Sequence, residues 1–112
     1  MPFEKILQRM LASDGVEAVV FLDSEGETIL AYGIQDRERL TALGAYQGIL
    51  RSTIERVGLS RDPTIVTMYD ERAVLTHHLK DGYFICVIFH EVSFANLQFH
   101  FQEVYKLLEN EL

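Results

Sequence analysis

Residues 16–33 read VEAVVFLDSEGETILAYG, and this stretch contains the two segments from which the rest of the fold can be worked out. The first, from Val16 to Leu22, is an almost unbroken apolar run, which is typical of a strand covered on both faces. The second, from Thr28 to Tyr32, has an extended pattern, and the turn residues Asp23 to Gly26 separate the two. We therefore predict a β-hairpin that other elements cover on both sides.

Three segments have the apolar spacing of amphipathic helices. A short helix begins after Pro2 and ends near Leu11, a long one runs from Leu40 to Val57, and a third runs from Ser93 to Leu112. In each of them the apolar residues recur three or four positions apart, which places them on one side of a helix. Residues 34–39 are interpreted as a charged connector that leads from the hairpin into the middle helix.

Three further strands are predicted between the second and third helices. They are Thr64 to Tyr69, Ala73 to Leu79 and Tyr83 to Phe89, and the pair Asp81-Gly82 is a hairpin signal between the last two. The last strand is apolar throughout and should be central, whereas the first follows Pro63 and should lie at an edge. The predicted order is α-β-β-α-β-β-β-α, an α+β fold in a single domain spanning residues 1–112.

Composition excludes several classes of partner. The chain has 112 residues and a net charge of −7, which repels nucleic-acid phosphate and anionic lipid alike. Its single cysteine, Cys86, cannot form an internal disulfide, which favours a reducing cytosolic compartment. We see no signal peptide and no apolar stretch long enough to span a bilayer, so we expect a cytoplasmic protein without membrane insertion.

The middle helix carries an unusually wide apolar arc. Apolar residues cover nearly half of its circumference, which is more than a single neighbour would need. Gly44 and Gly48, four positions apart, would open a groove for another backbone, and they lower helix propensity by about 1 kcal/mol each unless packing offsets this. We interpret this helix as packing on the sheet and against a second copy of itself. The alternative is that both glycines make ordinary close contacts within one chain.

Two stretches resemble the roadblock family of dynein light chains and the related bacterial regulators of Ras-like GTPases. The first is GVEAVVFLDSEGETILAYG at residues 15–33, where the family has a strand, an Asp-x-x-Gly turn and a strand ending in Gly. The second is ANLQFHFQEVYKLL at residues 95–108, where an Asn-Leu pair opens the final helix. Gln98 departs from the small residue that often follows this pair. The resemblance implies a five-stranded antiparallel sheet in an α/β/α sandwich, with the middle helix on one face and the terminal helices on the other.

The resemblance also implies a function. Family members dimerise through the middle helix and the adjoining edge strand, and they bind a Ras-like small GTPase as scaffolds or regulators that can stimulate GTP hydrolysis. For this chain we therefore predict a cytoplasmic, non-enzymatic homodimer that needs no cofactor. The predicted dimer interface consists of Leu43, Gly44, Tyr46, Gln47, Gly48, Leu50, Arg51, Ile54, Ile65 and Thr67.

Residues that could support catalysis or metal binding do not form a known pattern. The histidines and the cysteine have no ligand or nucleophile spacing, and the adjacent His77 and His78 should point to opposite faces of a strand. The acids Asp23, Glu25 and Glu27 lack the ligand pattern of a calcium loop. We therefore expect structural or surface histidines, an inert buried thiol, a solvated turn and no metal site.

No glycine-rich phosphate loop is present, so the chain should not bind GTP itself. An arginine supplied to a partner GTPase could stimulate hydrolysis. The five candidates are nevertheless interpreted as surface charges: Arg37, Arg39, Arg51, Arg56 and Arg61.

Two other function classes remain open at this point. One is a small-molecule sensor with a pocket lined by Tyr83, Phe84, Phe99 and Phe101, although these aromatic residues can equally form the core. The other is a hydrolase, which has the least support because the sequence offers no recognisable pair of base and nucleophile.

Overall fold

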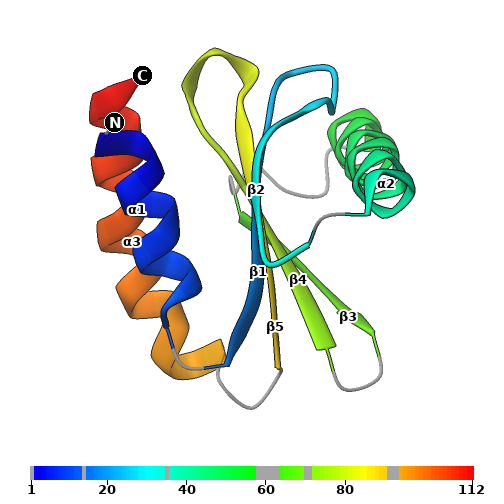
Figure 1. The fold of residues 1–112 in the computed structure, drawn as a ribbon. Helices are drawn as coiled ribbons and strands as arrows, with labels where there is room; N and C mark the ends of the chain where they lie inside the picture. Colours follow the sequence, from blue (N-terminus) through cyan, green and yellow to red (C-terminus); the bar gives the residue numbers. More distant parts are fainter. Residues whose placement is uncertain (1, 14, 35, 58–63, 70–71, 91–93) are drawn as a thin grey trace.

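The computed structural model describes residues 2–13, 15–34, 36–57, 64–69, 72–90 and 94–112. The elements in chain order are α1 (Pro2–Leu11), β1 (Val16–Leu22), β2 (Thr28–Tyr32), α2 (Arg37–Val57), β3 (Thr64–Tyr69), β4 (Arg72–His78), the 3-10 turn η1 (Lys80–Gly82), β5 (Phe84–His90) and α3 (Phe94–Glu111). The five strands form one antiparallel sheet in the order β2-β1-β5-β4-β3. Helices α1 and α3 lie side by side on one face of this sheet, and α2 lies on the other (Figure 1). The predicted α+β sandwich is thereby confirmed.

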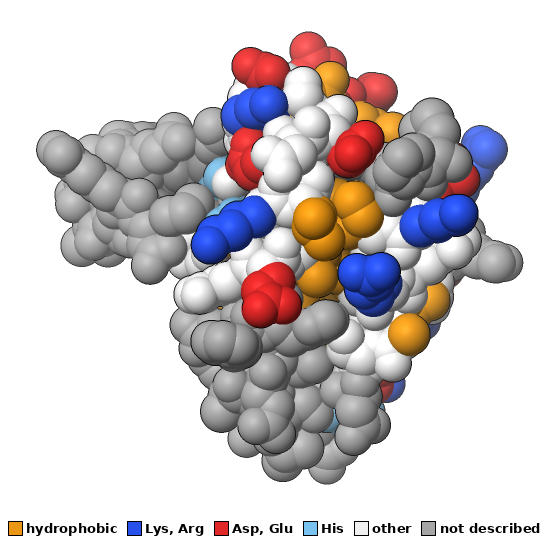
Figure 2. All heavy atoms as spheres, turned by 90° about the vertical axis from the view of Figure 1, so that its left-hand side faces the viewer, with side chains coloured by type: hydrophobic (Ala, Val, Ile, Leu, Met, Phe, Trp, Pro, Cys, Tyr) orange, Lys and Arg blue, Asp and Glu red, His pale blue; other side chains and the backbone are white. Residues whose placement is uncertain are grey.

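The larger core lies under α1 and α3. Alternate residues of β1, β4 and β5 point to this face, and they meet the apolar sides of the two helices. β5 is the middle strand and β3 an edge strand, as the apolar run and Pro63 predict. On the outside of this layer, a central strip of apolar side chains lies between charged ones (Figure 2). The buried residues of this core are Leu7, Met10, Val19, Phe21, Ala73, Leu75, Leu79, Ile85, Val87, Phe89, Phe101, Val104, Tyr105 and Leu108.

The core on the α2 face is smaller. Its buried residues are Val20, Leu22, Val74, Phe84 and Cys86. The helix contributes Leu40 and Leu43, which are only partly buried against this cluster. Helix α2 therefore covers its face of the sheet less completely than α1 and α3 cover theirs.

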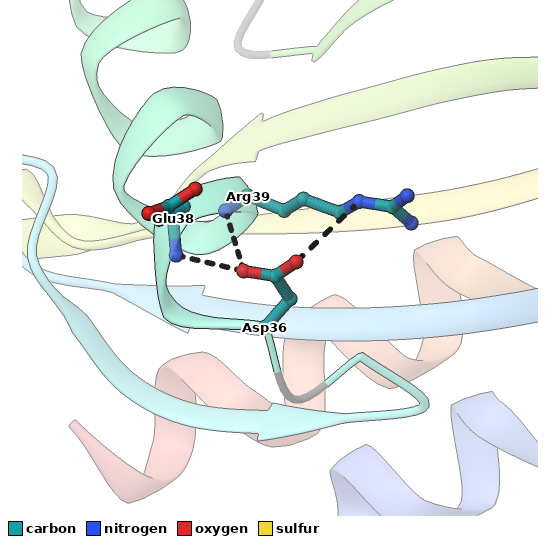
Figure 3. A network of polar contacts seen from close by, with 3 residues as sticks. All are labelled: Asp36, Glu38 and Arg39. Atoms are coloured by element: carbon teal, nitrogen blue, oxygen red, sulfur yellow. Dashed lines mark hydrogen bonds and ion pairs between the residues drawn. The ribbon is translucent and has the colours of Figure 1, made fainter.

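Helix α2 begins at Arg37, three residues before the predicted start at Leu40, so part of the supposed connector is helical. The reason is Asp36, whose Oδ1 accepts hydrogen bonds from the backbone N–H groups of Glu38 at 2.9 Å and Arg39 at 3.4 Å (Figure 3). This carboxylate satisfies donors that a helix leaves without an intrahelical partner in its first turn. The Asp36 cap was hidden in a stretch that looked merely charged.

Both predicted turns form as expected. Asp23 Oδ1 accepts hydrogen bonds from the backbone N–H groups of Glu25 at 2.9 Å and Glu27 at 3.0 Å, so this acid organises the β1–β2 turn. At the other turn, Asp81 and Gly82 adopt φ angles of 61° and 80°, the left-handed conformation typical of a tight hairpin.

In the described part of the chain, no helix combines the length and the apolar character needed to cross a bilayer.

Candidate partner-binding face of helix α2

The side of α2 that its own sheet leaves uncovered is rich in apolar residues. Tyr46 is 41% exposed and Ile49 is 68% exposed, and Ala42 and Ala45 are exposed beside them. We call these four residues the outer face of α2. Residues three and four positions apart lie next to each other on a helix, so the four form one continuous surface. The apolar residues that cover nearly half of the helix circumference therefore fall into two groups. One group meets the sheet, and the other forms this outer face.

Gly44 does not lie on the outer face. It is buried against the β1–β2 turn, and a Cβ at this position would overlap the carbonyl oxygen of Gly26 and lie 3.3 Å from Leu22 Cδ2. A Cβ at Gly26 would in turn lie 2.9 Å from the carbonyl oxygen of Gly44, and Gly26 has a φ of +85°. The close approach at Gly44 is thus made within one chain, which is the alternative considered for the sequence pattern.

Gly48 differs from Gly44. Apart from its two chain neighbours and the nearby backbone of its own helix, no atom of the described residues lies within 4 Å of the position that a Cβ on Gly48 would occupy. One turn beyond the contact with the hairpin, the surface of α2 therefore has room for another group to approach the backbone.

The other predicted interface residues have different positions. Leu43 is partly buried against the sheet, and Thr67 is a partly buried residue of the edge strand β3. The side chains of five predicted residues lie outside the described part of the structure: Gln47, Leu50, Arg51, Ile54 and Ile65. Tyr46 is thus exposed and Gly48 partly so, on different sides of α2 because they are two positions apart, while Gly44 is buried against the chain's own hairpin.

A charged cluster at the end of the sheet was not found from the sequence. Glu17 Oε2 lies 3.0 Å from Arg72 Nε, and Glu17 Oε1 lies 2.9 Å from His90 Nε2. A β-bulge between Val16 and Ala18 inserts Glu17 as an extra residue, and such bulges redirect side chains. The only signal in the sequence is the position of Glu17 as a single acid within an apolar strand.

The candidate catalytic residues have structural surroundings. His77 stacks on Tyr105 with ring centroids 3.6 Å apart, and its Nδ1 lies 2.6 Å from Thr64 Oγ1. His78 packs beside Phe84 on the opposite face, as predicted for adjacent residues of a strand. Among the described residues, no group of three His, Cys, Asp or Glu side chains is arranged to hold a metal ion.

The thiol of Cys86 is fully buried. Burial raises its pKa to about 12, against a smaller opposite effect of Thr76, whose Oγ1 lies 3.7 Å from Sγ. The thiolate is the reactive form of cysteine, so this side chain is held in its unreactive state at neutral pH.

The aromatic pocket suggested for a ligand sensor is not formed by the residues proposed for it. Phe84 belongs to the core under α2, whereas Phe101 and Tyr83 belong to the core under α1 and α3. The intervening sheet separates them, and the side chain of Phe99 lies outside the described part. The structure contradicts this alternative and places Tyr83, Phe84 and Phe101 in the two cores, because strand alternation sends Tyr83 and Phe84 to opposite faces.

Solved structures of other proteins have the same architecture. MglB of Myxococcus xanthus matches with a TM-score of 0.82 over 96% of this chain and 92% of that chain, at 13% sequence identity. A Roadblock/LC7 domain of Streptomyces avermitilis matches with a TM-score of 0.75 over 98% of this chain and 93% of that one, at 16% identity. The chain has a roadblock-like fold. The gliding protein MglB of Thermus thermophilus shares it, with a TM-score of 0.81 over 97% and 87% of the two chains at 12% identity.

The roadblock-like fold was predicted from two sequence patterns, and that prediction is confirmed. No model of a protein family matches the sequence, and a search among curated proteins gives no significant match. At identities of 12% to 16%, the likeness to the three structures concerns the fold. The function must be argued from the surface that this roadblock-like chain presents.

Proposed function

We propose that this chain is a cytoplasmic homodimeric regulator or scaffold that binds a Ras-like small GTPase and modulates its GTP hydrolysis without catalytic residues of its own. The observation that carries the proposal is the outer face of α2, where Tyr46 and Ile49 are exposed on a helix whose other side already meets its own sheet. Contiguous exposed apolar patches mark interaction sites. The likeness of the fold to MglB and the resemblance to the roadblock family support the choice of partner.

In the proposed dimer, the outer face of α2 packs against α2 of the second copy, with Tyr46 at one flank of the contact and Gly48 at the other. The open space at Gly48 lets the partner helix come close, while the exposed tyrosine supplies apolar area with a polar tip. Gly44 is not part of this contact because its own hairpin occupies that side of the helix. The proposed interface keeps the remaining predicted residues: Leu43, Tyr46, Gln47, Gly48, Leu50, Arg51, Ile54, Ile65 and Thr67.

The edge strand β3 extends the proposed interface. It pairs with β4 on one side and forms an end of the sheet on the other. An edge strand offers backbone N–H and C=O groups for pairing with another strand. Met68, which is 54% exposed, adds an apolar side chain at this edge. Pairing of two β3 strands would join the sheets of the two copies.

The proposed action on the GTPase is conformational. A binding surface without chemistry of its own changes hydrolysis by favouring one arrangement of the partner's switch regions. The candidate arginines of the first turn of α2, Arg37 and Arg39, are exposed surface residues, and the proposal does not require either to act as an arginine finger. The GTPase would therefore contribute the catalytic residues, and this chain the surface.

The dimer is tested by replacing Gly48 with leucine. The open space at Gly48 lets the substitution leave the chain's own packing intact, whereas in the dimer it would fill the gap between the two helices. We expect multi-angle light scattering to give the mass of a dimer for the natural chain and a lower average mass for Gly48→Leu. Gln8→Leu adds an apolar side chain at an exposed site of α1, on the opposite layer, and should retain the dimer mass. Equal masses for all three proteins would contradict the proposed packing.

A further inference from the structure

A cavity of about 470 Å³ lies between α2 and the sheet. Ala18 of β1, Val74 of β4 and Ile88 of β5 contribute from the sheet, and Ala42, Leu43 and Tyr46 contribute from α2. The volume falls within the range of about 300–1,000 Å³ typical of small-molecule sites. We call it the α2–sheet cavity.

The cavity exposes part of the middle of the sheet. Ile88 belongs to β5, the central strand, yet it is only partly buried, while its neighbours Val87 and Phe89 on the other face are fully buried. A central strand is normally covered on both faces by its own fold. The apolar wall formed by Ala18, Val74 and Ile88 is thus a surface that an apolar ligand could cover.

The described charged residues that line the cavity have a positive net charge, whereas the net charge of the whole chain is negative. Arg39 of α2 and Arg72 of β4 line the cavity, together with a single acid, Glu17. Both carboxylate oxygens of Glu17 are already engaged, one by Arg72 Nε at 3.0 Å and the other by His90 Nε2 at 2.9 Å. Among the described lining residues, the two arginines therefore carry one positive charge more than the carboxylate, in a protein whose net charge is −7.

Each arginine can still bind an anion. Arg72 reaches Glu17 through Nε, and a guanidinium carries further N–H donors on its two terminal nitrogens. The side chain of Arg39 extends away from the first turn of α2 and is 78% exposed (Figure 3). Its contact with Asp36 is long, at 3.8 Å from Nε to Oδ2, and the other oxygen of Asp36 caps the helix. Arginine binds carboxylate and phosphate groups in a two-pronged geometry.

We propose that the α2–sheet cavity binds an organic anion that carries one carboxylate or phosphate group on an apolar body. The apolar body lies against Ala18, Val74 and Ile88, and the anionic group pairs with Arg39 and Arg72. This site does not depend on a GTPase, but Leu43 and Tyr46 also belong to the proposed dimer interface, so the ligand and the second copy would compete for this side of α2. It is also distinct from the aromatic pocket considered above, because the described residues of that pocket, Tyr83, Phe84 and Phe101, do not line it.

The test uses octanoate and octan-1-ol, which have the same chain length but differ in charge. Titration calorimetry on the full chain should give saturable one-to-one binding of octanoate and at least tenfold weaker binding of octan-1-ol, because a charge-assisted hydrogen bond contributes at least this much. Arg39→Gln should weaken octanoate binding about tenfold and leave octan-1-ol unchanged. Arg9→Gln, an exposed arginine of α1 on the opposite layer, is the matched control and should bind octanoate like the natural chain.

A second pair of variants tests the location. Ala42→Trp adds bulk at an exposed position on the cavity wall and should abolish binding of both compounds, whereas Ala12→Trp, also exposed but beyond α1, should have no effect. Equal affinities for octanoate and octan-1-ol, unsaturable uptake, or unchanged binding in Arg39→Gln or Ala42→Trp would each overturn the proposal. If octanoate does not bind and Ala42→Trp lowers the mass in light scattering, the cavity is instead part of the contact between two copies.

Discussion

Replacing Gly44 with alanine tests how closely α2 packs against the β1–β2 turn. The new Cβ would overlap the backbone carbonyl of Gly26 and lie 3.3 Å from Leu22 Cδ2, so the helix or the turn must move. Overpacking of a core typically destabilises by about 1–3 kcal/mol, and the upper end applies because the group that the new Cβ overlaps is backbone and cannot rotate away. Alanine also favours the helix over glycine by about 1 kcal/mol. We therefore expect a net loss of about 2 kcal/mol in the free energy of unfolding.

The assay is urea denaturation followed by circular dichroism, with Gly48→Ala as the matched control. The same substitution in the same helix gains the same propensity but finds open space, so the isolated chain should become more stable by about 1 kcal/mol. Both variants are compared at protein concentrations where light scattering reports a monomer, which removes any contribution from the dimer. A Gly44→Ala variant as stable as Gly48→Ala would refute the packing of α2 on the turn.

Further predictions concern the helix cap and the buried thiol. Asp36→Ala should lower the free energy of unfolding by about 1 kcal/mol in urea denaturation. Asp36→Asn should retain most of the stability of the natural chain, because asparagine also caps helices. Equal losses in the two variants would argue against the cap. Cys86 should react with a thiol reagent at pH 8 at least ~100-fold more slowly in the folded than in the urea-unfolded chain, and equal rates would contradict its burial. Burial raises the pKa of Cys86 from 9.0 to about 12 and also raises the pKa of Tyr105, so their contribution to stability is complete below pH 9 and is lost as the pH rises toward 12. Urea midpoints measured at pH 8, 9 and 10 should fall, more steeply in the natural chain than in Cys86→Val, and a flat profile would contradict the shift.

Local patterns were sufficient to predict the elements, and the resemblance to the roadblock family implied how they form layers. The apolar runs of β1 and β5 indicated strands covered on both faces, and both lie inside the sheet. Asp81-Gly82 indicated a tight turn because few other residue pairs accept its positive φ angles. Such features depend on residues close together in the chain. The start of α2 was missed because Asp36 is one acid among several charged residues, and only its hydrogen bonds identify it as the cap.

The arrangement of the candidate site depends on contacts between distant residues. Gly44 lies against Gly26, a pairing that no local pattern contains, and this contact decides which side of α2 remains exposed. The α2–sheet cavity likewise requires the β-bulge at Glu17 to be placed beside Arg72 of another strand. The sequence therefore indicated that α2 has too much apolar surface for one neighbour. The structure shows which residues of α2 meet the sheet and the hairpin and which remain exposed.

The measurement that tests the central proposal most directly is binding of this chain to a Ras-like GTPase encoded near its gene, loaded in turn with GDP and with a GTP analogue. We expect binding at least tenfold tighter to one nucleotide state, together with a changed rate of GTP hydrolysis, because a regulator must distinguish the two arrangements of the switch regions. Equal affinity for both states, or no binding to either, would contradict the proposed function.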